Sequence, residues 1–215
     1  MNTITIPFLE AITPHTTTEE LLAAMAPLAA TELKEVPWAD DFPYRPSVHF
    51  RIAHTEVGIL LLYEVQEKHV KAVYRNTNDP VYKDSCVEFF LSFDGERYYN
   101  LEFNCAGVGL IGYGPARKAE RQRLPKETIE QVRTYSAISA AASENGDTGW
   151  RLLLHIPLAV FGAHAVSTLA GKRCTGNFYK CGDDLDEPHY VAWNPIHSPT
   201  PNFHLPECFG ELVFE

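Results

Sequence analysis

Basic residues are scarce in this sequence, and their scarcity limits the partners that the protein can bind. The 215 residues include 18 lysines and arginines against 28 aspartates and glutamates, so the formal net charge is −10. A chain that repels phosphate is a poor candidate for binding nucleic acid or an anionic membrane surface. We therefore expect a small neutral ligand, no nucleic acid or membrane partner, and a monomer in solution.

The sequence also lacks a basic leader and a long apolar run. The start, Met1–Pro7, has no stretch long enough for a signal peptide or a membrane span. A cytoplasmic protein is the expectation, with an exported form left open. Because no repeat, low-complexity tract or linker divides the chain, we predict one domain over residues 1–215, in which residues 1–37 form an N-terminal extension.

Cysteine and histidine occur without the spacings of a metal or redox motif. The five cysteines form no CxxC pair and no zinc-ligand pattern, and the nine histidines include no HExxH motif. We expect the cysteines to be reduced and buried as small apolar side chains. No motif requires a cofactor.

Helical periodicity is confined to one short segment near the start. Thr17 to Glu20 have the pattern of a capping box, and the apolar residues that follow are spaced by three or four. Pro27 lacks a backbone donor, so the helix should end close to it. We predict a short N-terminal helix and little helix elsewhere.

The rest of the chain consists of short β-branched and aromatic runs separated by turn residues. Because no helix lies between them to support parallel crossovers, an antiparallel all-β sandwich is predicted. The long loops 114–128 and 194–209 are candidate carriers of binding groups. The expected strands are 48–54, 57–65, 71–75, 86–93, 98–104, 108–113, 129–138, 149–156, 175–181, 189–193 and 211–214.

A hairpin around Asp94 and Gly95 is the most informative segment. Alternation places one set of apolar residues on the core face of both strands. With a loop of about five residues, Phe93 should face Tyr99 and Phe89 should face Phe103. The opposite face then carries Glu88, Phe90, Ser92, Asn100, Glu102 and Asn104.

This polar face of the hairpin has two interpretations. It can be the hydrated side of an antiparallel sheet. It can also hydrogen-bond sugar hydroxyls, because a glutamate accepts while an asparagine both donates and accepts. Aromatic residues on its flanks favour the second interpretation, since a sugar ring packs on an aromatic face. The candidates are Tyr82 and Trp193, although a lone tryptophan is often a core residue.

Several short motifs follow one another in a fixed order along the chain. They are Asp84–Phe90, Tyr98–Asn104, Gly149–Trp150, Ile156–Pro157, Gly176–Tyr179, Trp193–Pro195, Phe203–Pro206 and Phe209–Leu212. This order resembles carbohydrate-binding module family 9 and its stand-alone bacterial relatives, within the wider DOMON-like group. The resemblance runs from about Trp38 to the end of the chain, and it implies an immunoglobulin-like or jelly-roll β-sandwich in a carbohydrate-catabolic setting.

The resemblance also implies which residues hold the ligand. Family members hold a sugar, here expected to be of glucan or xylan type, between two aromatic rings, with a strand glutamate reading its hydroxyls. The corresponding residues are Glu88, Asn100, Tyr82 and Trp193. Glu102 shares their face, and the loop that ends at His204 should lie beside Trp193 and close the site.

Some relatives hold structural calcium with oxygens from loops. The matching acidic segment here contains Asp183, Asp184 and Asp186. Because it lacks the twelve-residue pattern of an EF-hand, a hydrated acidic turn is the favoured interpretation.

Three other functions stay open beside non-catalytic sugar binding. A glycoside hydrolase could use Glu88 and Glu102, since two carboxyl groups on one face suit that chemistry. A haem-binding DOMON-like domain would need two histidine ligands, because Met1 and Met25 lie outside the predicted sandwich. An interaction domain could bind another protein through its loops.

Overall fold

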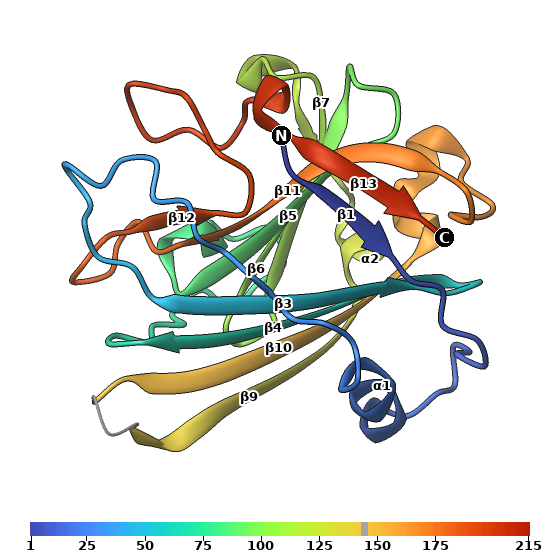
Figure 1. The fold of residues 1–215 in the computed structure, drawn as a ribbon, viewed down its shortest axis with the longest axis horizontal. Coiled ribbons are helices and arrows are strands. Elements are labelled where there is room, and N and C mark those ends of the chain that lie inside the picture. Colours follow the sequence, from blue (N-terminus) through green and yellow to red (C-terminus); the bar gives the residue numbers. More distant parts are fainter. Residues whose placement is uncertain (143–145) are drawn as a thin grey trace.

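Two β-sheets packed face to face form the body of the computed structural model, which describes residues 1–142 and 146–215 (Figure 1). The strands are β1 Thr3–Ile6, β2 Thr31–Glu32, β3 Ser47–His54, β4 Gly58–Glu67, β5 Cys86–Ser92, β6 Tyr98–Asn104, β7 Gly109–Gly114, β8 Gln122–Arg123, β9 Arg133–Ala142, β10 Thr148–Pro157, β11 Arg173–Cys181, β12 Tyr190–Ala192 and β13 Gly210–Phe214. The α-helices are α1 Thr18–Met25 and α2 Lys126–Ile129, and 3₁₀ turns span Val81–Lys83, Lys118–Glu120, Leu158–His164 and Pro206–Cys208.

The larger sheet has eight strands in the order β1-β13-β11-β5-β6-β7-β8, with β12 paired to β11, and the smaller has the order β2-β3-β4-β10-β9. Among the strand pairs of the described residues, only β1 and β13 run parallel. The all-β sandwich that the sequence predicts is therefore confirmed. None of the helices in the described residues is long and apolar enough to cross a membrane.

The main core lies between the two sheets and takes alternate residues of β5 and β6, as the hairpin pattern predicts. The predicted register is wrong by two residues. Tyr99 pairs with Leu91 instead of Phe93, so Phe89 does not face Phe103. Because the shift is even, each side chain keeps its predicted face.

The turn of this hairpin explains the shift in register. Ser92 Oγ donates to the carbonyl oxygen of Arg97 at 2.6 Å and accepts from the Gly95 amide at 3.0 Å. The Asp94 carboxylate accepts the next two amides, those of residues 96 and 97. These side-chain bonds close the loop over residues 93–97, one residue earlier than the sequence pattern indicates.

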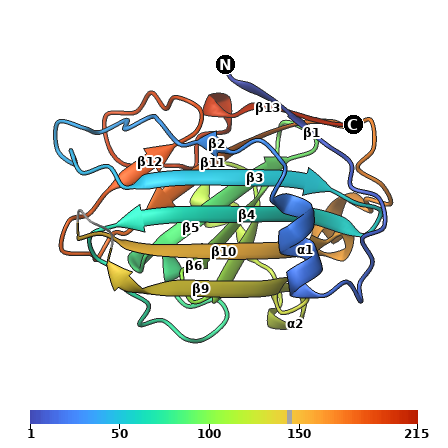
Figure 2. The same cartoon turned by 60° about the horizontal axis from the view of Figure 1, so that its bottom comes forward.

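Helix α1 lies across the outer face of the smaller sheet (Figure 2). Thr17 and Glu20 form the predicted capping box, and the helix ends at Met25, two residues before Pro27. Leu21 and Met25 are buried against an apolar strip of that sheet, which removes their surface from water. The strip consists of Ala53, Leu60, Leu62 and Leu153.

Several local predictions differ from the structure. Residues 71–75 form no strand, because the amides of Val73 and Tyr74 donate to the buried Asp84 carboxylate instead of to a ladder partner. The strand expected at residue 129 begins at Arg133, after α2. The short strands β1, β2 and β8 were not predicted. All five cysteines are free and buried, as expected.

Candidate functional site

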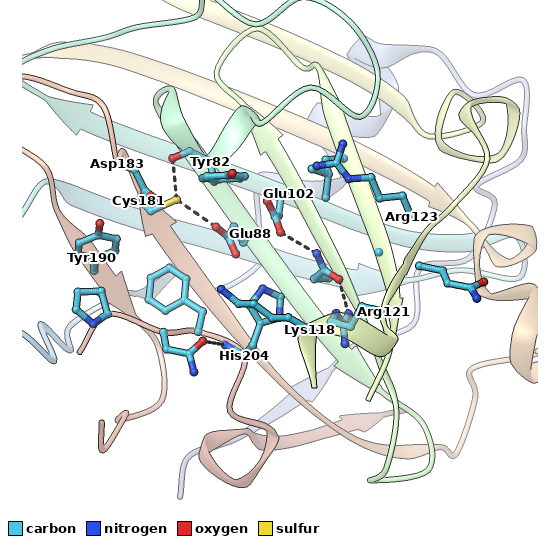
Figure 3. A pocket seen from close by; sticks show the side chains of 17 residues that line it. Tyr82, Glu88, Glu102, Lys118, Arg121, Arg123, Cys181, Asp183, Tyr190 and His204 are labelled. Atoms are coloured by element: carbon cyan, nitrogen blue, oxygen red, sulfur yellow. Dashed lines mark hydrogen bonds between the residues drawn. The ribbon is translucent and has the colours of Figure 1, made fainter. Parts of the chain in front are cut away.

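A pocket opens on the outer face of the larger sheet, over β5 and β6, with a cavity volume of about 370 Å³ (Figure 3). This volume falls within the range of small-molecule sites, about 300–1,000 Å³. Strands β5 to β8 and β11 contribute to its lining, together with segments near Tyr82, Asp183, Tyr190 and Pro201–His204. Five of the six ligand-binding residues predicted from the sequence line it: Tyr82, Glu88, Asn100, Glu102 and His204.

The floor of the pocket is polar although it is shielded from water. Glu88 pairs with Glu102 across the β5–β6 ladder, and both are at most 5% exposed. Asn100 Nδ2 donates to Glu102 Oε1 at 2.7 Å. Gly112 lies opposite Asn100, where a Cβ would approach the amide oxygen to 2.5 Å, so glycine leaves room for this side chain. The interpretation of this face as the hydrated side of a sheet is wrong, because loops cover it.

One carboxyl oxygen of the floor has no hydrogen-bond partner among the described residues. This atom, Glu102 Oε2, is buried. Buried polar atoms are nearly always hydrogen-bonded, and leaving one unpaired costs about 1–3 kcal/mol. An unpaired acceptor at the edge of a cavity is therefore a position where a ligand donor would be stabilised.

The two glutamates of the floor have altered acidity. Burial raises the pKa of the Glu88 carboxyl well above its ordinary value, and the neighbouring Cys181 and Glu102 side chains add to the effect. Burial also raises the pKa of Glu102, to about 7, against the opposing hydrogen bond from Asn100. A carboxyl group with a raised pKa holds its proton to a higher pH than an ordinary glutamate, and in its protonated form it can donate as well as accept.

Basic side chains from the segment between β7 and β8 form one wall of the pocket (Figure 3). The Arg121 guanidinium lies 3.9 Å from the ring centroid of Tyr98 and donates to the Asn100 amide oxygen. Lys118 and, from β8, Arg123 also line the pocket. Sequence reasoning missed these residues because they are distant from the hairpin in the chain. The available signal was the concentration of arginine and lysine in loop 114–128 of an acidic protein.

Aromatic side chains lie on other sides of the cavity. Tyr82, which is partly exposed, stands in the 3₁₀ turn before β5. Tyr190 and Phe203 line the pocket as well, and Phe203 stacks on Tyr179 with ring centroids 4.1 Å apart. The aromatic lining expected from the sequence is present, but only Tyr82 comes from the predicted pair.

Trp193 is absent from this pocket, which corrects its proposed place beside the sugar. It follows β12, where Tyr190 and Ala192 face the outer side of the sheet while Val191 and Trp193 face the main core. The indole is 6% exposed and packs edge-on against Phe178, with ring centroids 5.6 Å apart. The alternation of β12 therefore makes Trp193 a core residue.

His204 lies in the pocket wall, and its Nδ1 atom is 2.8 Å from the Tyr98 hydroxyl oxygen. Burial lowers the pKa of its imidazole to about 3, and the nearby Arg121 and Lys118 charges act in the same direction. The ring is therefore neutral at physiological pH and serves as a polar, flat surface. The loop that ends at His204 borders the site, as the sequence predicts, but Trp193 does not line the same pocket.

The three acidic residues considered for calcium have separate surroundings. Asp183 lines the pocket, and burial raises the pKa of its carboxyl to about 6. Asp184 forms an ion pair with Lys83 at 3.2 Å. Asp186 is exposed, 3.7 Å from His69. The calcium site stays a prediction.

Comparisons with known proteins identify the family and the fold. Residues 17–214 match the model of the family described as carbohydrate-binding family 9. A comparison with curated protein sequences finds no match.

Among solved structures, the chain is similar to a crystal structure from Bacteroides uniformis ATCC 8492 described as a candidate carbohydrate-binding protein. The two share 39% sequence identity over 99% of both chains, with a TM-score of 0.90. Two structures of a family 9 module from Caldicellulosiruptor kristjanssonii share the fold. The complex with glucose has 14% identity and a TM-score of 0.57 over all of this chain and 96% of that one. The complex with cellotriose has 11% identity and a TM-score of 0.60 over all of this chain and 94% of that one.

Proposed function

The chain belongs to carbohydrate-binding family 9, and from that premise we propose that its pocket binds a sugar of glucan or xylan type without catalysing a reaction. The setting that we infer is the breakdown of polysaccharides. The observation that carries the proposal is the buried polar floor, where Glu88, Asn100 and Glu102 meet beneath the cavity.

The hydrogen-bonding capacity of the floor suits sugar hydroxyls, each of which donates and accepts. The unpaired Oε2 atom of Glu102 can accept from one hydroxyl. In its protonated form, which the raised pKa favours, the Glu88 carboxyl can donate to a second hydroxyl. The Asn100 amide links the Glu102 carboxyl to the Arg121 guanidinium. Because these groups are held by packed strands, little side-chain entropy is lost when a ligand binds.

The shape of the site suits the end of a chain or a single sugar. Lys118, Arg121 and His204 border the cavity (Figure 3), and Phe203 lines it as well. A polymer that continued in both directions would need an open groove, whereas this cavity of about 370 Å³ is a pocket. Glucose and cellotriose are the first ligands to test, since they occupy two of the similar structures.

Replacing Glu88 with alanine should weaken the binding of glucose or cellotriose about thirtyfold. Such a loss corresponds to about 2 kcal/mol, the magnitude expected when hydrogen bonds to a buried carboxyl group are removed. Glu88→Gln should bind with nearly the affinity of the original protein, because glutamine, like a protonated glutamate, both donates and accepts. Isothermal titration calorimetry measures both variants.

Glu96→Ala is the matched control, because Glu96 is an exposed glutamate in the turn of the same hairpin. It should leave the affinity unchanged. The proposal fails if no mono- or oligosaccharide binds to the original protein, or if Glu88→Ala binds sugar as tightly as Glu96→Ala.

Tyr82→Ala should weaken sugar binding about tenfold, whereas Tyr82→Phe should keep most of the affinity. The ring of Tyr82 lines the pocket and is only partly buried in the free protein, so a sugar ring can pack on it. An aromatic contact of this kind contributes about 1 kcal/mol or more. Ligand-observed NMR titration separates the two variants. Equal losses in both would assign the effect to the hydroxyl group and contradict a stacking role.

A glycoside hydrolase is the second candidate, favoured by the direct pairing of Glu88 with Glu102 across the ladder. Hydrolysis combines one protonated and one ionised carboxyl group at the working pH. Burial raises the pKa of both groups here, that of Glu102 to about 7, so their acidity by itself does not distinguish catalysis from binding. Release of reducing sugar by the original protein, abolished in Glu88→Gln, would establish the hydrolase instead.

A further inference from the structure

Two thiols and one carboxyl group meet at the pocket floor, where β5 and β11 run side by side. Cys86 and Cys181 are directly paired across the two strands, and Glu88 is the next residue of β5 on the same face. Cys181 Sγ donates to Glu88 Oε1 at 3.1 Å. One ligand atom from each of the three residues lies within 4.8 Å of the other two. We propose that Cys86, Cys181 and Glu88 bind a thiophilic divalent cation, such as Zn²⁺ or Cd²⁺.

The spacing of the three groups is compatible with one tetrahedral ion. Zinc bonds of about 2.3 Å to sulfur and about 2.1 Å to oxygen separate neighbouring ligand atoms by about 3.6–3.8 Å. The 3.1 Å contact between Cys181 and Glu88 can widen to this separation by rotation about side-chain bonds, with the backbone pairing of Cys86 and Cys181 kept.

The donor set selects the class of ion. Thiolate ligands favour Zn²⁺, Cd²⁺ and other soft or borderline ions, whereas Ca²⁺ and Mg²⁺ prefer sites made of oxygen. On binding, each thiol that becomes a ligand, and the carboxyl group where it is protonated, releases its proton to solvent. Two thiolates and a carboxylate carry three negative charges, so a divalent ion would leave the centre with a net charge of −1.

Three protein ligands leave one position of the ion open, as in zinc sites that also bind a water or a small ligand. Cys181 and Glu88 both line the cavity, so this open coordination position would face the same space as the proposed sugar.

The pairing of Cys86 with Cys181 could not be predicted from sequence spacing, because the two residues come from strands that are far apart in the chain.

The other cysteines provide matched controls. Cys174 belongs to β11, like Cys181, but it is buried in the main core between the sheets, on the opposite face of the strand. Among the described residues, the only group of three potential metal ligands is the one that contains Cys86, Glu88 and Cys181. Cys174→Ala therefore removes a buried thiol of the same strand without removing a ligand of the proposed ion.

The test is a titration of the reduced, metal-free protein with Cd²⁺ and then Zn²⁺. Cadmium should bind with one equivalent per chain and produce the ultraviolet charge-transfer absorption of cadmium–thiolate bonds, and calorimetry should give the same stoichiometry for zinc. Cys86→Ala and Cys181→Ala should each lower the affinity at least tenfold, and Cys174→Ala should leave it unchanged. Far-ultraviolet circular dichroism checks that each variant is folded.

Absence of the absorption band in the original protein overturns the proposal without reference to any variant. It is also overturned if Cys86→Ala and Cys181→Ala bind as tightly as Cys174→Ala. The sugar titrations are made in the presence of a chelator, so that the results for sugar and for metal are independent of each other.

Discussion

Lys180→Met is expected to lower the free energy of unfolding by about 3–5 kcal/mol. Lys180 Nζ lies 2.8 Å from Glu67 Oε2, and both side chains are fully buried. Removing one partner of a buried ion pair leaves the other charge without compensation, at a cost of this magnitude. The measurement is equilibrium unfolding in urea followed by circular dichroism.

The surroundings of this ion pair explain why the loss should be large. Trp150 Nε1 donates to Glu67 Oε1 at 2.6 Å, and His189 Nε2 lies 2.8 Å from Lys180 Nζ. Burial, the larger cause, and the Lys180 charge lower the pKa of His189 to about 3 in the original protein. In the variant the burial remains, and it opposes the protonation of His189, whose Nε2 atom lies 3.7 Å from Glu67 Oε2. Glu67 would keep its hydrogen bond from Trp150 and this contact, in place of the ammonium group of Lys180.

Two further variants make the prediction on Lys180 falsifiable. The double variant with Lys180→Met and Glu67→Gln should recover part of the stability, since it removes the isolated charge. Lys68→Met removes one partner of an exposed ion pair with Glu187, which should cost less than about 1 kcal/mol. A loss for Lys180→Met no greater than that for Lys68→Met would contradict the prediction.

Trp193→Ala should destabilise the fold by about 3–5 kcal/mol while leaving the sugar affinity of the folded protein unchanged. The indole fills the core between Phe178 and Gly210, where a Cβ on the glycine would approach the tryptophan ring to 2.4 Å. Truncating a buried tryptophan loses its transfer free energy and leaves a cavity. Urea unfolding and calorimetric titration of glucose at a low temperature measure the two effects separately.

Tyr82→Ala provides the opposite pattern, with weaker sugar binding and little change in stability, because Tyr82 is only partly buried. The comparison of these two variants distinguishes a core residue from a pocket residue. If Trp193→Ala weakened sugar binding as much as Tyr82→Ala without destabilising the protein, the assignment of Trp193 to the core would be wrong.

Local patterns in the sequence were sufficient to predict part of the secondary structure. Alternation over 98–104 predicted β6 with its observed bounds, and the capping box of Thr17 and Glu20 predicted the start of α1. These features depend on residues that are close in the chain. The strand expected over 71–75 failed because a distant carboxylate, that of Asp84, takes two of its amide donors.

The candidate site was predictable only in part, for a similar reason. Glu88, Asn100 and Glu102 share one face because alternation and hairpin pairing place them there. Arg121 reaches Asn100 from a loop 21 residues away, and Cys181 reaches Glu88 across 93 residues. No pattern within either segment encodes these contacts.

By itself, the sequence determined the sandwich class, the core and outer faces of the hairpin and the polar floor of the pocket, because periodicity and turn chemistry act over a few residues. The tertiary structure alone decided the burial of Trp193 and the pairing of Cys86 with Cys181. These features depend on packing between segments that are distant in the chain. The free energy of that packing cannot be inferred from the sequence of one segment alone.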